Sequence, residues 1–201
     1  MTKEYTPLQS FPLKAGSSFA HPLQVLPERV KLSDPATDVM TDLSKVSLIG
    51  VRAQTSMDRA NAKMIRYGVR MLLVLDDYDQ LVGLLTATDV LGERPMHFLQ
   101  NMGGTHADIT VRDIMTPLRE LEAMRLEDVQ NAKVGHIVAS LKKSHRQHAL
   151  VMCEGLDDRQ TVCGLFSVTQ IARQLGAQVQ SFEVAHTFAE IEAVIARGLN
   201  A

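Results

Sequence analysis

Two hydroxyl groups and one carboxylate follow directly after an apolar run in this sequence. The run from Leu81 to Leu85 is typical of a buried strand, and Thr86, Thr88 and Asp89 come immediately after it. A helix that begins at this point presents backbone N–H groups that favour phosphate. A neighbouring carboxylate accepts hydrogen bonds from the two adjacent hydroxyls of a ribose. The string therefore predicts a nucleotide-binding site.

The same string occurs a second time, 81 residues later. Residues 83–89 read GLLTATD, and residues 164–170 read GLFSVTQ. Gln170 stands where the first copy has Asp89, so the second copy lacks the acid. Hydrogen bonds to a charged group contribute about 1.5–3 kcal/mol, against about 1 kcal/mol for neutral ones. We therefore expect binding at the second copy to be weaker by roughly ten-fold.

Helix capping explains the same residues without a ligand. Thr86 and Asp89 have the spacing of a capping box, and so do Ser167 and Gln170. In that motif the two side chains satisfy backbone N–H groups at the start of a helix. Ligand binding and capping are therefore both open as roles for Asp89, and for Ser167 and Gln170.

Each copy of the string ends a unit of strand, helix, strand, strand and short helix. Apolar residues recur on one face of the long helices, and continuous apolar runs mark the strands that follow them. The strings Val39-Met40-Thr41 and Ile114-Met115-Thr116 stand at the start of the two units. The expected elements are a strand near 47–51, a helix over 57–67, strands over 71–75 and 81–85, a helix over 88–91, a helix over 131–143, strands over 149–153 and 162–166, and a helix over 171–175.

Three segments lie outside these two units. Residues 1–33 contain four prolines and no clear period, which predicts an extended arm over the core or over a partner chain, with a mobile tail as the alternative. Residues 93–108 read as a linker with a short helix. Residues 177–201 predict a C-terminal helix, whose apolar stripe needs a surface to cover it. The predicted domains are 1–33, 34–92, 93–108, 109–176 and 177–201.

The composition is that of an ordinary globular protein, with 45% apolar and 22% charged residues. The net charge is −2 without a basic block, only 4% of residues are aromatic and there is no Trp, which argues against nucleic-acid binding. No apolar run reaches the about 18 residues of a membrane span, and the N-terminus lacks the apolar stretch of a signal peptide. We therefore expect a cytoplasmic protein that binds neither membranes nor nucleic acid.

The sequence offers no spacing typical of a catalytic or metal site. His136, His145 and His148 do not fall on one helix face, and no glycine-rich loop with a phosphate-binding lysine occurs. Cys153 and Cys163 lie on neighbouring strands, and without a secretory signal we interpret them as reduced thiols. We expect neither catalytic residues nor a bound metal.

With its two ordered copies of these elements, the chain resembles a tandem cystathionine-β-synthase (CBS) domain pair, or Bateman module, over about residues 34–176. The resemblance implies an α/β (α+β) fold in which two β-α-β-β-α repeats pack with pseudo-twofold symmetry. The extended arm and the C-terminal helix would be additions to that fold. The resemblance also implies a stand-alone regulatory module rather than an enzyme, assembled as a homodimer, with adenosine-based ligands in two clefts between the repeats.

The same resemblance implies one principal ligand site. Asp89 is expected to bind the ribose hydroxyls and Arg70 to be the phosphate cation. Ser167 and Gln170 would belong to a weaker second site. The strings 83–89 and 164–170, which end the two repeats, are called the closing strings. The residues of the principal site are Leu84, Thr86, Thr88 and Asp89 of the first closing string, Arg70 and Met71 at the start of the preceding strand, and Gln147 and His148 across the cleft.

The function hypothesis is therefore a sensor of AMP, ADP or ATP that signals through an unidentified effector protein or through self-association. No obligatory cofactor is expected, because the nucleotide would be a regulatory ligand. The first alternative is a dimeric structural scaffold whose clefts bind no ligand, which Gln170 favours and which Asp89 with Arg70 opposes. A nucleotide hydrolase and a nucleic-acid binder are further alternatives, and no motif in the sequence supports either.

Overall fold

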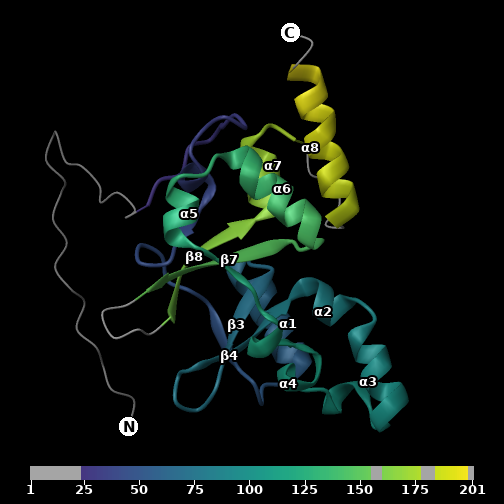
Figure 1. The fold of residues 1–201 in the computed structure, drawn as a ribbon. Coiled ribbons are helices and arrows are strands. Elements are labelled where there is room, and N and C mark those ends of the chain that lie inside the picture. Colours follow the sequence, from purple (N-terminus) through teal and green to yellow (C-terminus); the bar gives the residue numbers. More distant parts are fainter. Residues whose placement is uncertain (1–23, 155–159, 178–183, 199–201) are drawn as a thin grey trace, which may run out of the picture.

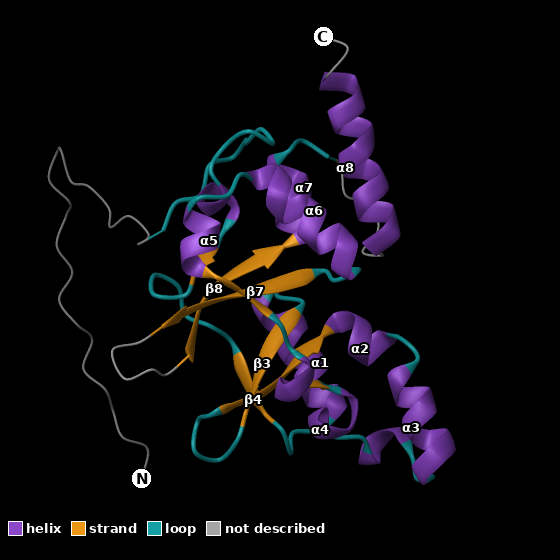
Figure 2. Cartoon of the chain, viewed as in Figure 1, coloured by secondary structure: helices purple, strands orange, loops and turns teal. Residues whose placement is uncertain are grey.

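Two four-stranded sheets lie at the centre of the protein, with helices on the outer face of each (Figures 1 and 2). The computed structural model describes residues 24–154, 160–177 and 184–198. The strands are β1 (Thr41–Asp42), β2 (Gly50–Arg52), β3 (Met71–Leu75), β4 (Leu81–Thr86), β5 (Thr116–Pro117), β6 (Ala123–Arg125), β7 (His148–Glu154) and β8 (Gln160–Ser167). The α-helices are α1 (Met57–Tyr67), α2 (Ala87–Leu91), α3 (Arg94–Met102), α4 (Val111–Ile114), α5 (Leu126–Gln130), α6 (Val134–Ser144), α7 (Val168–Gln174) and α8 (Val184–Gly198), and the 3-10 helices are η1 (Ala36–Val39), η2 (His106–Asp108) and η3 (Leu118–Glu120).

The two sheets have the same strand order, and each takes one edge strand from the other half of the chain. The first sheet is ordered β2-β3-β4-β5, and the second is ordered β6-β7-β8-β1. β2 and β6 run parallel to their neighbours, and the other pairs are antiparallel. The predicted α/β fold of two equivalent repeats is confirmed. Residues 34–92 and 109–176 each contribute strands to both sheets, because β1 and β5 are exchanged.

The central strands are buried on both faces. In β3, Leu72 and Val74 face the apolar core of the first half, while the alternate side chains Met71 and Leu73 face the second sheet. A strand buried on both sides requires a continuous apolar run, which is why residues 71–75 read MLLVL. The apolar layer between the sheets is called the inter-sheet core below. Its buried members are Met71, Leu73, Leu84 and Leu150.

The two long helices of the repeats form where the apolar spacing predicts them. α1 buries Met57, Ala60 and Met64 on one face and ends at Gly68, whose φ of 64° is the left-handed conformation that glycine adopts readily. α6 begins at Val134 rather than near residue 131. The short strand β6 and helix α5, which the sequence did not predict, come before it.

Part of the N-terminal arm lies along the second half of the molecule. The amide of Gln24 bonds the carbonyl oxygen of Met40 and the N–H of Asp42, each at 2.9 Å, and so pairs with the edge of β1. The buried side chain of Gln174 donates from Nε2 to the carbonyl oxygen of Pro27 at 2.7 Å. Residues 24–30 thus cover the core as predicted, and residues 1–23 lie outside the described part of the chain.

The C-terminal helix α8 packs on the helices of the second half, where Figure 1 shows it beside α6 and α7. Phe188 and Ile191 are buried there, and Val194 and Ile195 are partly buried against the same apolar cluster. Glu192 forms an ion pair with a lysine of α6. The apolar stripe predicted for this helix is therefore covered by the second half of the same chain.

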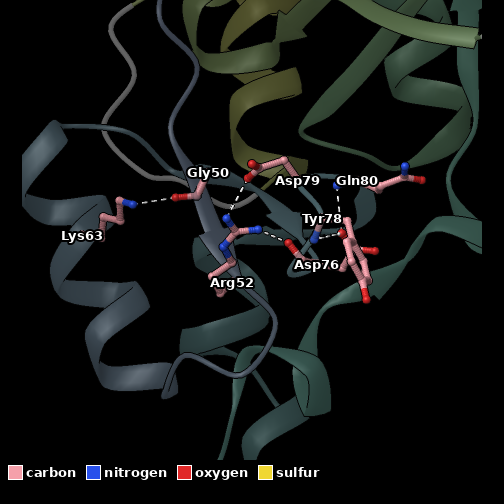
Figure 3. A network of polar contacts seen from close by, with 7 residues as sticks. All are labelled: Gly50, Arg52, Lys63, Asp76, Tyr78, Asp79 and Gln80. Atoms are coloured by element: carbon pink, nitrogen blue, oxygen red, sulfur yellow. Dashed lines mark hydrogen bonds and ion pairs between the residues drawn. The ribbon is translucent and has the colours of Figure 1, made fainter.

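A polar network closes the turn between β3 and β4 (Figure 3). The Asp76 carboxylate accepts hydrogen bonds from the backbone N–H groups of Tyr78 and Gln80, with Oδ1 at 2.9 Å from each nitrogen. Arg52 on β2 donates to the Asp76 carbonyl oxygen and, over 2.7 Å from Nη2 to Oδ1, to Asp79. These bonds join the edge strand β2 to the far end of the β3–β4 hairpin.

Two glycines make room for the exchanged strands. A Cβ atom on Gly83 would lie 2.7 Å from the carbonyl oxygen of Thr116 and 2.8 Å from Sδ of Met115. A Cβ atom on Gly164 would lie 2.7 Å from Sδ of Met40. Gly83 and Gly164 are thus required by the methionine that precedes the exchanged strand of the other half, Met115 before β5 and Met40 before β1.

We predict that alanine at either glycine destabilises the fold by about 1–3 kcal/mol, because overpacking displaces neighbours. Gly83→Ala should cost more than Gly164→Ala, since it meets a backbone oxygen that cannot rotate away. Urea denaturation measures both. The matched control is Gly164→Ala in a Met40→Ala background, where the added methyl group should cost less than in the wild type. Equal stability of Gly83→Ala and wild type would contradict the packing argument.

Candidate functional site

A cleft of about 330 Å³ lies between the closing string of the first repeat and the start of β7, and is called the Asp89 cleft. The junction of β4 and α2 contributes two hydroxyls and the Asp89 carboxylate, and the second repeat contributes Gln147 and His148. Apolar walls face these polar groups. The lining residues are Leu84, Thr86, Thr88, Asp89, Arg94, Thr116, Glu120, Leu121, Glu122, His145, Arg146, Gln147, His148 and Leu150.

Asp89 completes a capping box at the start of α2. Its Oδ2 atom lies 2.7 Å from the backbone nitrogen of Thr86 and 2.8 Å from Thr86 Oγ1, and both groups donate to it. In return, the Asp89 N–H donates to Thr86 Oγ1 at 3.3 Å. The capping interpretation of this pair is therefore confirmed, and the carboxylate that caps the helix also lines the cleft.

Arg94, the first residue of α3, holds the other oxygen of the same carboxylate. Its Nη1 lies 3.2 Å from Asp89 Oδ1 and 2.7 Å from the carbonyl oxygen of Ile114, and its Nη2 lies 3.2 Å from Thr116 Oγ1. The sequence prediction missed Arg94 because it placed residue 94 in a linker. The available signal was an arginine shortly after an acid that was expected to lie in a cleft.

A second cleft, of about 420 Å³, lies between the closing string of the second repeat and the start of β3. It is called the Arg70 cleft. Arg70 and Met71 line it together with Ser167 and Gln170, and much of the rest of its wall is apolar. The Arg70 guanidinium reaches α7, where Nη1 lies 3.3 Å from Oγ1 of Thr169.

The structure therefore separates residues that the sequence analysis placed in one site. Arg70 and Met71 do not line the cleft of Asp89, and they join Ser167 and Gln170 instead. The reason is that each closing string faces the strand start of the opposite repeat across the inter-sheet core. The order of residues within one repeat does not reveal which strand start a closing string faces. Leu84, Thr86, Thr88, Gln147 and His148 do lie with Asp89, and Gln147 and His148 also line the Arg70 cleft.

The two clefts differ in charge. Three carboxylates line the Asp89 cleft, from Asp89, Glu120 and Glu122, together with two arginines. Arg70 and Arg173 line the other cleft, and none of its described lining residues carries a carboxylate. Burial and the neighbouring Arg173 lower the pKa of the Arg70 guanidinium. Asp89, the predicted ribose acceptor, and Arg70, the predicted phosphate cation, therefore lie in different clefts, and among the described residues only the Asp89 cleft contains carboxylates.

The second copy of the string does not form the capping box that its spacing suggests. Ser167 stands at the N-cap of α7 without a side-chain cap hydrogen bond. The longer amide of Gln170 turns elsewhere, with Oε1 3.4 Å from Thr41 Oγ1 and Nε2 3.4 Å from Oε1 of Gln174. The capping prediction for this pair was wrong, because Gln170 joins a polar chain toward the exchanged strand β1.

His148 forms part of the wall between the two clefts. Its burial, and then the charge of Arg70, lower the pKa of the imidazole to about 4. Among the residues that the structure describes, the buried Nδ1 atom has no hydrogen-bond partner. A neutral imidazole therefore stands between the clefts at neutral pH.

Both cysteines are free thiols, and burial together with contact to Cys153 raises the pKa of Cys163 to about 12. Within the described ranges, no group of three or more His, Cys, Asp and Glu side chains is placed to hold a metal ion. None of the helices in the described part of the chain is long and apolar enough to cross a membrane.

Comparison with known proteins identifies the fold. Residues 36–95 match the family model of the CBS domain. Among solved structures, a conserved protein from Pyrococcus horikoshii is 22% identical, with a TM-score of 0.52 over 76% of this chain and 100% of that one. A CBS-domain-containing protein from Agrobacterium tumefaciens is 14% identical, with a TM-score of 0.52 over 71% and 94% of the two chains. A protein with CBS domains from Burkholderia ambifaria is 20% identical, with a TM-score of 0.50 over 68% and 87%.

No curated protein sequence matches the chain. The CBS-domain model thus matches residues 36–95, and the chain shares its fold with these CBS-domain proteins over about 70% of its length. The family resemblance stated from the sequence is thereby confirmed.

We predict that His148 makes stability depend on pH. Between about pH 6.5 and pH 4 the unfolded chain protonates this histidine and the folded chain does not, so the unfolded state binds more protons. Stability should therefore fall as the pH decreases through this window, by about 2 kcal/mol at pH 4.5 relative to pH 7.5. Urea denaturation at both pH values gives the change in the free energy of unfolding for the wild type and for His148→Gln. The difference between these two changes is the contribution of His148.

The matched control is His97→Gln, which changes an exposed histidine on α3. It should keep the wild-type pH dependence. An identical pH dependence for His148→Gln and wild type would show that His148 titrates normally in the folded protein.

Proposed function

We propose that the chain is a regulatory module that binds an adenosine-based nucleotide of the AMP, ADP or ATP class in the cleft between its two CBS repeats. The observation that carries the proposal is the position of Asp89. Its carboxylate lies beside two hydroxyls and apolar walls, in a cleft that both repeats line. A ligand bound there would contact both halves of the molecule at once.

The chemistry of the cleft suits the parts of such a ligand. The Asp89 carboxylate is an acceptor for ribose hydroxyls, and Thr88 adds an exposed hydroxyl at the same edge. Leu84 and Leu150 offer buried apolar surface from the two sheets, which suits an adenine ring. By binding residues of both repeats, the ligand would favour one arrangement of the halves over another, to the extent that its affinity differs between them.

We further propose that the output passes through an effector protein or through self-association as a homodimer. In the described part of the chain, most of the large exposed apolar side chains belong to the first repeat and to the segment that follows it, where a partner chain could cover them. They include Ile65, Tyr67, Tyr78, Leu91, Met96 and Met102.

A structural scaffold with empty clefts is the second candidate. The observation that favours it is that both oxygens of Asp89 already have protein partners, Thr86 and Arg94. In that case Asp89 would serve only to start α2 and to fix α3 beside it.

A thermal-shift titration with AMP, ADP and ATP distinguishes the two candidates. A ligand at 100 times its dissociation constant stabilises the folded state by about 2.7 kcal/mol, which for this size raises Tm by roughly 5–10 °C. Asp89→Asn should reduce the rise to about half at the same ligand concentration, because the amide keeps an oxygen for the cap but loses the charge, and a roughly ten-fold weaker affinity leaves about 1.4 kcal/mol of stabilisation. Asp89→Ala should also lose about 1–2 kcal/mol of stability without ligand, since it removes the cap.

The outcome is decisive for the role of Asp89. A rise in the wild type that persists unchanged in Asp89→Asn would place the ligand elsewhere. No rise with any of the three nucleotides would leave the scaffold as the better account.

A further inference from the structure

Arg94 occupies an oxygen of Asp89 that a ribose would need. We propose that Arg94 is the specificity-determining residue of the Asp89 cleft: a ribose displaces its guanidinium from Asp89, and a phosphate on the same ligand then binds that guanidinium. The inference rests on the proposed function and deepens it. It assigns to the cleft adenosine compounds that carry a phosphate, in preference to adenosine itself.

The argument begins with the acceptor positions of the carboxylate. Each carboxylate oxygen has two lone pairs that accept hydrogen bonds. Oδ2 receives two bonds from Thr86, one from its N–H and one from its hydroxyl, so this oxygen is fully used. Oδ1 is in contact with Arg94 and has one acceptor position left. Two ribose hydroxyls need two acceptor positions on Oδ1. One is free, and the second becomes available only when Arg94 moves off this oxygen.

Displacement requires only a small movement. Nη1 of Arg94 lies closer to the carbonyl oxygen of Ile114, at 2.7 Å, than to Asp89 Oδ1, at 3.2 Å. Nη2 lies 3.2 Å from Oγ1 of Thr116. These two bonds keep the guanidinium at the wall of the cleft after it leaves the carboxylate. It therefore remains where a ligand bound to Asp89 can reach it.

Charge then decides which ligand gains most. The contact of Arg94 with Asp89 is an ion pair between a guanidinium and a carboxylate, and contacts between charged groups are stronger than those between neutral ones. Adenosine breaks this contact and supplies no anion in return. A nucleoside phosphate breaks the same contact and gives Arg94 a bidentate anionic partner. The other arginine of the cleft, Arg146, donates from Nη2 to the carbonyl oxygen of Glu120 at 3.2 Å.

The test is an isothermal titration of the full chain with AMP and with adenosine. In the wild type, AMP should bind at least ten-fold more tightly than adenosine. In Arg94→Met, adenosine should bind several-fold more tightly than in the wild type, because Oδ1 is vacated, and AMP should lose its advantage. Arg94→Lys keeps the charge without the two-pronged donor and should retain part of the preference. The matched control, Arg125→Met, changes an exposed arginine of β6 outside both clefts and should behave as wild type.

Each other outcome has a separate meaning. An AMP-to-adenosine ratio that is the same in Arg94→Met and wild type overturns the inference and leaves the proposed function intact. Binding of neither compound to any of the proteins refutes the proposed function, and the inference with it. If Arg94→Met does not fold, the comparison passes to Arg94→Lys, and a ratio unchanged from wild type there overturns the inference equally.

Discussion

Both clefts depend on the packing of one sheet against the other. The inter-sheet core fills the centre of this contact with apolar side chains, so the polar groups at the strand ends are left at its two margins. At one margin Asp89 meets the start of β7, and at the other Arg70 meets the end of β8. A change that moved the sheets relative to each other would therefore alter both clefts together, with Gln147 and His148 as their common wall.

The repeated elements could be predicted from the sequence because local signals define them. Apolar runs gave the strands β3 and β4, and one apolar face with a glycine at its end gave α1. The composition of each cleft could not be predicted in the same way. It depends on which strand start each closing string faces, and the strands involved belong to different repeats. Arg94 was missed for a related reason, since its contacts join the supposed linker to β5.

The capping and binding interpretations of Asp89 were alternatives in the sequence, and the structure shows that they need not compete. One carboxylate oxygen starts α2, while the other faces the cleft and Arg94. The capping bonds fix the side chain in position, so a group that binds it meets a preorganised acceptor. The second copy lacks this arrangement, because Gln170 bonds toward Thr41 and Gln174 instead of back to the start of its helix.

The exchange of β1 and β5 has a mechanical consequence. Neither half of the chain completes its own sheet, so a repeat expressed alone would leave an unpaired edge at β4 or β8, of the kind that recruits other chains. For the same reason the halves cannot swing apart like two lobes on a hinge without breaking β-ladder hydrogen bonds. Any movement of the two halves must then be a sliding or twisting of two interlocked sheets, and the molecule should unfold as a single cooperative unit.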